Sequence, residues 1–308
     1  SSSGQTPPGL FQPDVLTNPR VESDGTLTYN ENGLATKVRP DGTSEVKVDG
    51  ATVQRDAQDR ATKIEYKDGN VREFEYDGTK LSGITENGNK FSVYNEELYN
   101  PRGENTGRKN IYVGRNGAFS YTESNGDYKS FSADGSRSTS KANGSYVDQN
   151  PDGKIVRIGS GVGNQTNLEY DQSGQLKSLN TPDGKSYDLH TSTDASGAEK
   201  KEYRAADGSV MRDLQVGHDG TLRYQDKDGK LHTRFSNGNH LATTKTKDEL
   251  DQRAKEINQG NGTFSSGSHL QKSMEDLNAA DRLALNESYR TQFGTTLKDE
   301  LKSESWNP

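Results

Sequence analysis

The chain of 308 residues contains no cysteine, and only 27% of its residues are hydrophobic. The lack of cysteine excludes disulfides, thiolate metal sites and cysteine nucleophiles, and it is compatible with either redox compartment. No apolar run approaches the length of a membrane-spanning helix, and no signal peptide is recognisable. Because the chain begins at Ser1 without a methionine, we expect a processed or excised piece whose targeting segment is not part of this sequence.

No charge of one sign dominates the sequence. The chain has 39 Lys and Arg against 46 Asp and Glu, a net charge of −7, and the two signs are interspersed. A basic stripe that follows a phosphate backbone is missing, so nucleic acid is not expected as a partner. The low apolar content and the 28% of charged residues border on the composition of disordered chains. The prediction of a folded chain therefore depends on periodicity.

Glycine is abundant, with 33 residues, and many of the glycines follow Asp or Asn. In residues 60–84, Ile64 and Tyr66 alternate with polar residues, Asp68 and Gly69 follow, and a second alternating run comes next. A two-residue hairpin turn needs positive φ at its central positions, which Asp or Asn followed by Gly adopts at least cost. Alternation with period two places one set of side chains on one face of a sheet. This segment predicts a β-hairpin and the start of the next one.

The same turn signal recurs along most of the chain, usually at intervals of eight to ten residues. That interval leaves about seven residues for each strand, close to the usual strand length. The glycines that follow Asp or Asn are Gly25, Gly33, Gly42, Gly50, Gly69, Gly78, Gly88, Gly117, Gly126, Gly135, Gly144, Gly153, Gly184, Gly208, Gly220, Gly229 and Gly238. The pattern predicts an antiparallel β-hairpin meander in which each unit is buried mainly by its neighbours.

Two segments resemble the tyrosine-aspartate (YD) repeats of Rhs-type and wall-associated surface proteins. The repeats of that family read roughly Tyr-Asp, two residues, Gly, a polar residue and Leu. The segments here are residues 76–81, YDGTKL, and residues 170–176, YDQSGQL, with Lys80 and Gln175 where the family usually has Arg. The resemblance covers much of residues 24–238. It implies a repetitive β array on an extracellular or cell-surface protein.

The N-terminal residues differ from the array. Residues 1–20 are rich in Ser, Pro and Gly, and we expect an extended arm there, followed by the hairpin array over residues 21–240. The apolar anchors of the arm are Leu10, Phe11, Val15 and Leu16. The arm is either a flexible leader or an interaction element that docks on its own sheet or on a neighbouring subunit.

A small all-α domain is predicted over residues 246–308. At Thr246 the regular series of hairpin-turn glycines has ended, and apolar residues begin to recur at helical spacing. Thr246 is the predicted N-cap of the first helix, and Glu249 completes a capping box. The further predicted helices are residues 268–277, residues 278–293 with Asn278 as N-cap and Gly294 as C-terminal stop, and residues 296–304.

Part of this helical domain resembles a single annexin repeat. Residues 281–305, DRLALNESYRTQFGTTLKDELKSES, are similar to the second half of such a repeat. By this resemblance, Gly260, Gly262 and Thr263 lie where annexins have their calcium loop, and Glu304 lies where they have a remote acidic ligand. The resemblance implies that backbone carbonyls of the loop and the Glu304 carboxylate bind Ca²⁺, with water or a lipid phosphate completing the shell. The alternative is a helical cap without useful calcium affinity.

No catalytic set is recognisable in the sequence. The five histidines are scattered, and no two of them have the spacing of a zinc-binding face. No nucleophile elbow with a His and Asp partner can be named. We therefore predict a protein that is not an enzyme and has no cofactor apart from the possible calcium.

Three functions follow from these patterns. The leading hypothesis is a non-enzymatic extracellular or cell-surface structural protein, a scaffold or self-assembling subunit with a helical attachment end. Its expected partners are further copies of itself, joined at exposed sheet edges, or a cell-surface glycan. The alternatives are a calcium-dependent module that binds acidic phospholipid or another surface through the annexin-like repeat, and a fragment of an Rhs-type shell that encloses a toxin.

Overall fold

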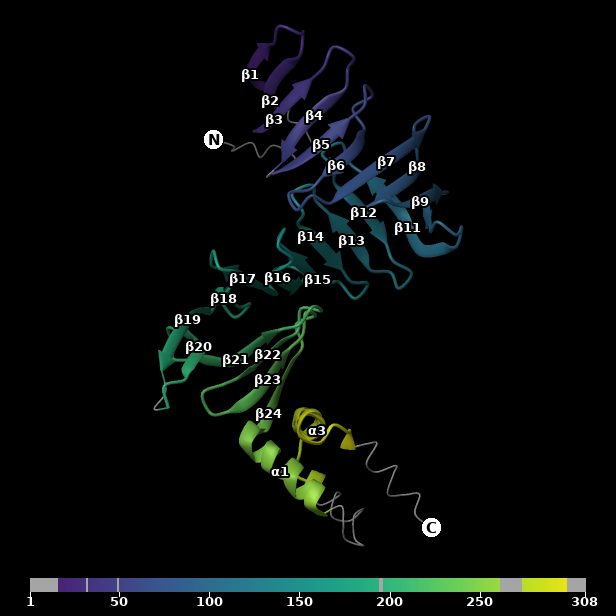
Figure 1. The fold of residues 1–308 in the computed structure, drawn as a ribbon. Coiled ribbons are helices and arrows are strands. Elements are labelled where there is room, and N and C mark those ends of the chain that lie inside the picture. Colours follow the sequence, from purple (N-terminus) through teal and green to yellow (C-terminus); the bar gives the residue numbers. More distant parts are fainter. Residues whose placement is uncertain (1–15, 32, 49, 194–195, 261–272, 298–308) are drawn as a thin grey trace, which may run out of the picture. The chain divides into compact units, whose positions relative to one another are not determined.

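The computed structural model describes residues 16–31, 33–48, 50–193, 196–260 and 273–297. It confirms the predicted mostly-β class, with antiparallel strands in succession and helices at the C-terminal side (Figure 1). The first fourteen strands are β1 (Leu16–Val21), β2 (Leu27–Glu31), β3 (Leu34–Val38), β4 (Ser44–Val48), β5 (Ala51–Arg55), β6 (Ala61–Glu65), β7 (Val71–Asp77), β8 (Lys80–Glu86), β9 (Asn89–Tyr94), β10 (Glu97–Tyr99), β11 (Asn105–Val113), β12 (Phe119–Thr122), β13 (Tyr128–Phe131) and β14 (Arg137–Ser140). The next ten are β15 (Ser145–Gln149), β16 (Ile155–Ser160), β17 (Gln165–Tyr170), β18 (Leu176–Asn180), β19 (Ser186–Thr193), β20 (Glu199–Ala205), β21 (Val210–Val216), β22 (Leu222–Gln225), β23 (Lys230–Arg234) and β24 (His240–Thr246). The helices are α1 (Lys247–Gly260) and α3 (Ala279–Phe293).

The chain divides into two compact units. Unit 1 comprises Ser1–Ala142 and Gln149–Gly153, and unit 2 comprises Asn143–Asp148 and Lys154–Pro308. Within unit 1, each strand from β1 to β14 pairs antiparallel with its neighbours in the chain. Within unit 2, the strands from β16 to β24 pair in the same way. Each unit is therefore an antiparallel meander, as the regularly spaced hairpin turns in the sequence predict.

The turns differ from the prediction in their length. In the hairpin of β6 and β7, the Gly69 N–H donates to the Tyr66 carbonyl at 2.9 Å, and the Tyr66 N–H donates to the Asn70 carbonyl at 2.9 Å. Gly69 takes φ +83°, while Asp68 accepts the Asn70 N–H at 3.0 Å. This is a β-turn followed by a glycine in the left-handed region, a longer loop than the predicted two-residue turn. The prediction is wrong here because Asp serves as the acceptor of the turn and only Gly needs positive φ.

The ten strands from β5 to β14 and the ten from β15 to β24 are two copies of one arrangement. In the first copy the Tyr76 hydroxyl donates to the Ala61 carbonyl at 2.9 Å, and in the second the Tyr170 hydroxyl donates to the Ile155 carbonyl at 2.9 Å. The equivalent core positions are Val53 and Val147, Ile64 and Ile158, Phe74 and Leu168, Ile84 and Leu179, Phe119 and Leu222, and Tyr121 and Tyr224. The chain therefore contains an internal duplication larger than the hairpin.

Each copy curls so that one face of its meander covers itself. In unit 1, Phe119 of β12 packs on Phe74 of β7, with 6.1 Å between the ring centroids. A Cβ atom at Gly117, in the turn before β12, would lie 2.9 Å from Cγ2 of Val53. In unit 2, a Cβ atom at Gly220 would lie 2.8 Å from Cγ2 of Val147. These close contacts let a narrow apolar stripe form a core, which explains how the chain folds with few hydrophobic residues.

Helix α1 begins at the predicted cap, and helix α3 begins and ends where the sequence predicts. Thr246 and Glu249 form the reciprocal capping bonds, with Thr246 N to Glu249 Oε2 at 2.7 Å and Glu249 N to Thr246 Oγ1 at 3.2 Å. Asn278 caps α3, and Gly294 follows it at φ +76°. Residues 261–272 and 298–308 lie outside the described part, so the predicted helix over 296–304 and most of the one over 268–277 are not tested.

Helix α3 is tied to the last strand by a buried carboxylate. Asp281 is 0% exposed. It accepts the N–H groups of Thr244 and Lys245 of β24 at 2.8 and 3.0 Å, and the Thr244 hydroxyl at 2.7 Å. The same carboxylate closes the capping box with the Asn278 N–H at 3.0 Å. One side chain therefore satisfies both a helix start and the amides of an edge strand.

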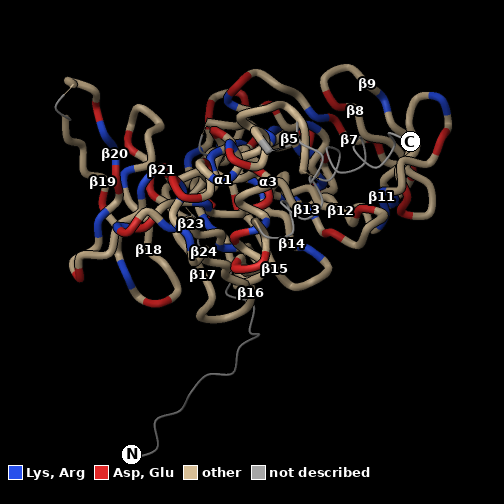
Figure 2. The backbone as a smooth tube through the Cα atoms, turned by 90° about the horizontal axis from the view of Figure 1, so that it is seen from below, with Lys and Arg blue, Asp and Glu red and all other residues tan. Residues whose placement is uncertain are grey.

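Charged residues of both signs are distributed along the strands and turns (Figure 2). Many form ion pairs between neighbouring strands, such as Arg212 of β21 with Glu202 of β20 at 2.9 Å. Such cross-strand pairs add a few tenths of a kcal/mol each, roughly 0.2–1. Among the described residues, no helix has the length and apolar character needed to cross a membrane.

Candidate functional site

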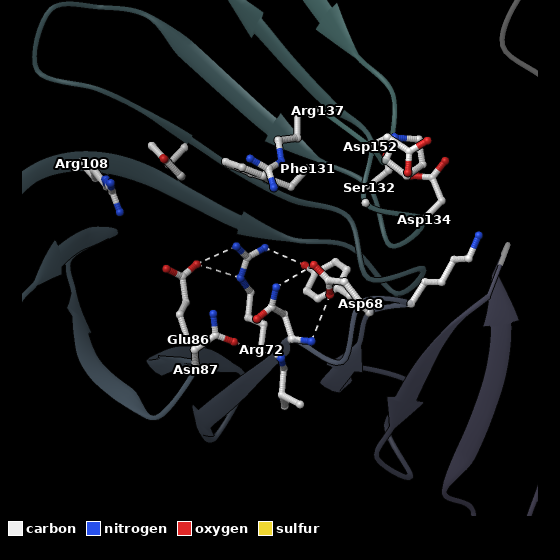
Figure 3. A pocket seen from close by; sticks show the side chains of 17 residues that line it. Asp68, Arg72, Glu86, Asn87, Arg108, Phe131, Ser132, Asp134, Arg137 and Asp152 are labelled. Carbon is white, nitrogen blue, oxygen red and sulfur yellow. Dashed lines mark hydrogen bonds and ion pairs between the residues drawn. The ribbon is translucent and has the colours of Figure 1, made fainter. Parts of the chain in front are cut away.

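A cavity of about 470 Å³ lies in unit 1 between the turn that follows β6 and the turn that follows β13 (Figure 3). The remaining walls come from strands β7, β8, β11, β12, β13 and β14 and from the turn that follows β15. These elements are distant in the chain and come together because the meander curls onto itself. The volume falls within the range of roughly 300–1,000 Å³ that is typical of ligand pockets.

Arg72 forms the centre of the cavity wall. Its guanidinium donates to Glu86 Oε1 from Nε at 2.8 Å and to the Tyr66 hydroxyl at 2.9 Å. The Cζ atom lies 4.4 Å from the ring centroid of Phe119 and 5.2 Å from that of Phe131. With 12% of its side chain exposed, Arg72 is held by an ion pair and by two aromatic faces at once. Figure 3 shows Arg72 and Glu86 pointing toward each other.

Aromatic rings form the apolar part of the wall. Tyr121 and Phe131 stack with 5.8 Å between their centroids and 25° between their planes. Burial raises the pKa of both Tyr66 and Tyr121 above the ordinary value of 10.0, so both hydroxyls stay protonated at neutral pH. Arg108 lies over the Tyr121 ring, with its Cζ atom 4.7 Å from the ring centroid. The wall is therefore aromatic and is edged by guanidinium groups.

The two ends of the cavity carry different charges. Figure 3 shows Arg108 at one end and Asp134 and Asp152 at the other. Arg108 is neutralised by Glu123, with 3.7 Å between Nε and Oε1. Asp134 accepts bonds from the Ser136 N–H and hydroxyl at 2.8 and 2.7 Å. The arrangement positions binding groups, and it shows no nucleophile held by a base.

The equivalent place in unit 2 is almost filled. A cavity of about 20 Å³ remains there, lined by Thr166, Arg234 and Gly238 among others. The strand registers make Arg234 the counterpart of Phe131, because each pairs with the apolar residue that starts the preceding strand. The Asn164 side chain packs directly against Gly238 and donates to the Ser160 hydroxyl at 2.7 Å. Only the first copy therefore keeps an open cavity.

The structure places two of the residues predicted as sites. Leu16 starts β1 and pairs with Glu31 of β2, and Gly260 is the last residue of α1. The other predicted interaction residues, Leu10, Phe11 and Val15, and the other predicted calcium ligands, Gly262, Thr263 and Glu304, lie outside the described residues. Their roles stay predictions. Within the described part of the chain, no three His, Asp or Glu side chains are grouped so as to hold a metal ion.

Sequence reasoning missed the groups that the curled sheet brings together. Arg72 and Phe131 belong to different hairpins, and nothing in the local pattern joins them. A second missed group is the stack of His232 and His240, whose Nδ1 and Nε2 atoms lie 3.0 Å apart, with His232 also 3.0 Å from Asp226. The hairpin signal at Gly238 was sufficient to place these two histidines diagonally on adjacent strands, where His232 pairs with Ala242 and His240 with Arg234.

Comparison with protein-family models and with curated proteins gave no match. Several solved structures are similar to the chain. They include the TCP10 domain of Danio rerio CPAP in complex with a STIL peptide (17% identity, 73% of this chain and 96% of that chain, TM-score 0.18). The TCP domain of Drosophila melanogaster SAS-4, in complex with a proline-rich motif of Ana2, gives 14% identity over 80% and 98%, with TM-score 0.17. A CPAP G-box domain, for which a role in centriole elongation is suggested, gives 17% identity over 52% and 100%, with TM-score 0.19.

These matches correct the functional expectations. The three structures named above are CPAP and SAS-4 domains, two of them in complex with a peptide, and not YD-repeat, Rhs or annexin proteins. The predictions of an extracellular or cell-surface scaffold, of a calcium-dependent phospholipid-binding module and of a toxin shell are contradicted. So are the predicted partners, namely further copies of the chain, a glycan or a phospholipid. At these TM-scores the likeness carries no argument for what this chain itself binds.

The physical reason for the YD resemblance is local. The Tyr170 hydroxyl donates to the Ile155 carbonyl of the adjacent strand β16, and Asp171 accepts the N–H groups of Ser173 and Gln175 at 2.9 and 3.0 Å. Any antiparallel meander with this turn benefits from the same residues. The motif therefore reports turn chemistry and carries no information about a surface location.

Proposed function

We propose that the protein is a non-catalytic binding module that holds an extended segment of another polypeptide in the cavity of unit 1. The observation that carries the proposal is the open cavity of about 470 Å³ with Arg72 and Phe131 in its wall. Aromatic and Arg side chains are the residues that most often dominate binding energy at protein interfaces. The cavity has an aromatic wall and an acidic end, which suits a bound peptide that has apolar side chains at some positions and polar or basic ones at others.

A selection experiment tests this function. A displayed library of random short peptides is selected against the whole protein, and the binders are measured against variants. Phe131→Ala removes part of the wall, and Ser132→Tyr places a ring at an exposed lining position. We expect both to weaken binding at least tenfold, which corresponds to about 1.4 kcal/mol.

The matched control is Tyr128→Ala. Tyr128 lies on the same strand as Phe131, three residues away and so on the opposite face, and it is 44% exposed. This variant should bind the selected peptides as the wild type does. A library that yields no binders, or binders that respond equally to Tyr128→Ala and Phe131→Ala, refutes the proposed function.

For the helical residues we propose a structural role as the cover of the edge strand β24. This interpretation retains the predicted division into an array over 21–240 and a helical domain over 246–308. Its support is the bonding of Asp281 to the β24 amides, together with the packing of α1 and α3 around Leu250, Leu285 and Tyr289. A covered edge cannot add a strand from another chain.

A further inference from the structure

Arg137 lines the cavity next to its aromatic wall, and its side chain has no counter-ion among the described residues. It begins β14, is exposed, and is the cross-strand partner of Phe131 (Figure 3). The other two arginines of the cavity are already paired, Arg72 with Glu86 and Arg108 with Glu123. Among the described residues, the Arg137 side chain makes no hydrogen bond or ion pair.

The duplicated half shows how the same position is arranged when it is internally satisfied. In unit 2 the residue equivalent to Arg137 is His240, because Arg234 pairs with His240 as Phe131 pairs with Arg137. His240 stacks on His232 with 5.1 Å between centroids and shares a hydrogen bond with it. In unit 2, where the cavity is almost filled, His240 has a hydrogen-bond partner. In unit 1, where the cavity is open, the equivalent Arg137 side chain has none among the described residues.

On the basis of the proposed function, we propose that Arg137 anchors a carboxylate of the bound segment, with an adjacent apolar side chain packed on Phe131. The planar guanidinium offers two parallel N–H donors that match the two oxygens of a carboxylate. Asp68, Asp134 and Asp152 also line the cavity, and their carboxylates repel such a group. A carboxylate of the segment is therefore held at Arg137 and kept away from these side chains.

The test uses two small probes of equal shape and different charge, N-acetylphenylalanine as its carboxylate and N-acetylphenylalaninamide. Both are titrated into the isotope-labelled whole chain and followed by amide and arginine Nε–H shifts. We expect the carboxylate to bind with a Kd of about 1 mM and the amide to bind at least tenfold more weakly. The shifts should map to Phe131 and Arg137.

Variants separate an anchor from a general charge effect. Arg137→Gln should weaken binding of the carboxylate at least tenfold, and Arg137→Lys should restore part of it. Lys80→Gln removes the same charge from an exposed residue of unit 1 that does not line the cavity, and it should leave binding unchanged. His240→Gln, the equivalent change in unit 2, should also have no effect.

Equal binding of the two probes, no binding of the carboxylate up to about 10 mM, or insensitivity to Arg137→Gln each overturns the inference. The result is distinguishable from failure of the proposed function. Selected peptides that depend on Phe131 but not on Arg137, and that show no acidic residue, leave the binding module intact and refute only the carboxylate anchor.

Discussion

Replacement of Asp281 by alanine should release the helices from the sheet. The carboxylate is fully buried and accepts four hydrogen bonds, two from backbone amides of β24, one from the Thr244 hydroxyl and one from the Asn278 N–H. Hydrogen bonds to a charged group contribute about 1.5–3 kcal/mol each, and an orphaned buried donor costs about 1–3 kcal/mol. Because the donors regain water when α3 separates from β24, we expect a total loss of about 3–5 kcal/mol, the range for breaking a buried charged contact.

Amide hydrogen exchange is the assay that localises this loss. In Asp281→Ala, the amides of Thr244 and Lys245 and those of α3 should exchange about two to four orders of magnitude faster, while amides of unit 1 keep their rates. Asp281→Asn keeps the shape but replaces one acceptor by a donor, so its effect should be intermediate. Asp248→Ala, at an exposed position of α1, is the control and should change stability by no more than about 0.5 kcal/mol. Unchanged exchange in Asp281→Ala would refute the reasoning.

The pH dependence of the same contact provides a second check. Burial alone raises the pKa of Asp281, but the hydrogen bonds from Thr244, Lys245 and Asn278 outweigh it, so the pKa lies below the ordinary value of 3.8. A carboxyl whose folded pKa is depressed stabilises the fold above its unfolded pKa. The stability difference between wild type and Asp281→Ala should therefore be constant near neutral pH and shrink as the pH falls below about 3.8.

Two further predictions concern the turns and the histidine stack. Gly117→Ala should destabilise unit 1 by about 2–4 kcal/mol in urea unfolding, because the added Cβ would lie 2.9 Å from Val53 Cγ2. Gly69→Ala is the control: its Cβ would have nothing within 4 Å, so this variant should lose only the roughly 1–2 kcal/mol that a side chain in the left-handed region costs. Equal losses in the two variants would contradict the packing role of Gly117. Burial first, and then Arg234, lower the pKa of His240 below 6.5. His240 therefore binds a proton more readily in the unfolded chain, so the free energy of unfolding should fall as the pH drops below about 6.5. His240→Gln should remove this part of the pH dependence, and an unchanged pH dependence in that variant would contradict the prediction.

The candidate site illustrates what local patterns leave out. Turn chemistry identified Gly69 and Gly117 alike as hairpin glycines, yet only Gly117 lies against a distant strand. The two tyrosine motifs were recognised as similar, but the ten-strand duplication that contains them was not, because its signal is carried by scattered single positions. Arg72 and Phe131 stand apart in the sequence and have no periodic relation. Their contact depends on how far the meander curls.

The sequence by itself determined the strand succession, the hairpin positions and the caps of the helices, since each depends on residues within one turn of each other. Asp68 accepts an amide two residues on, and Asn278 caps the helix that starts beside it. Tertiary structure decided the curl of the meander, the bond from Asp281 to β24 and the open cavity beside Arg137. The physical reason is that these features arise from packing between strands remote in the chain, where a ring against a glycine or an arginine between two aromatics sets the geometry.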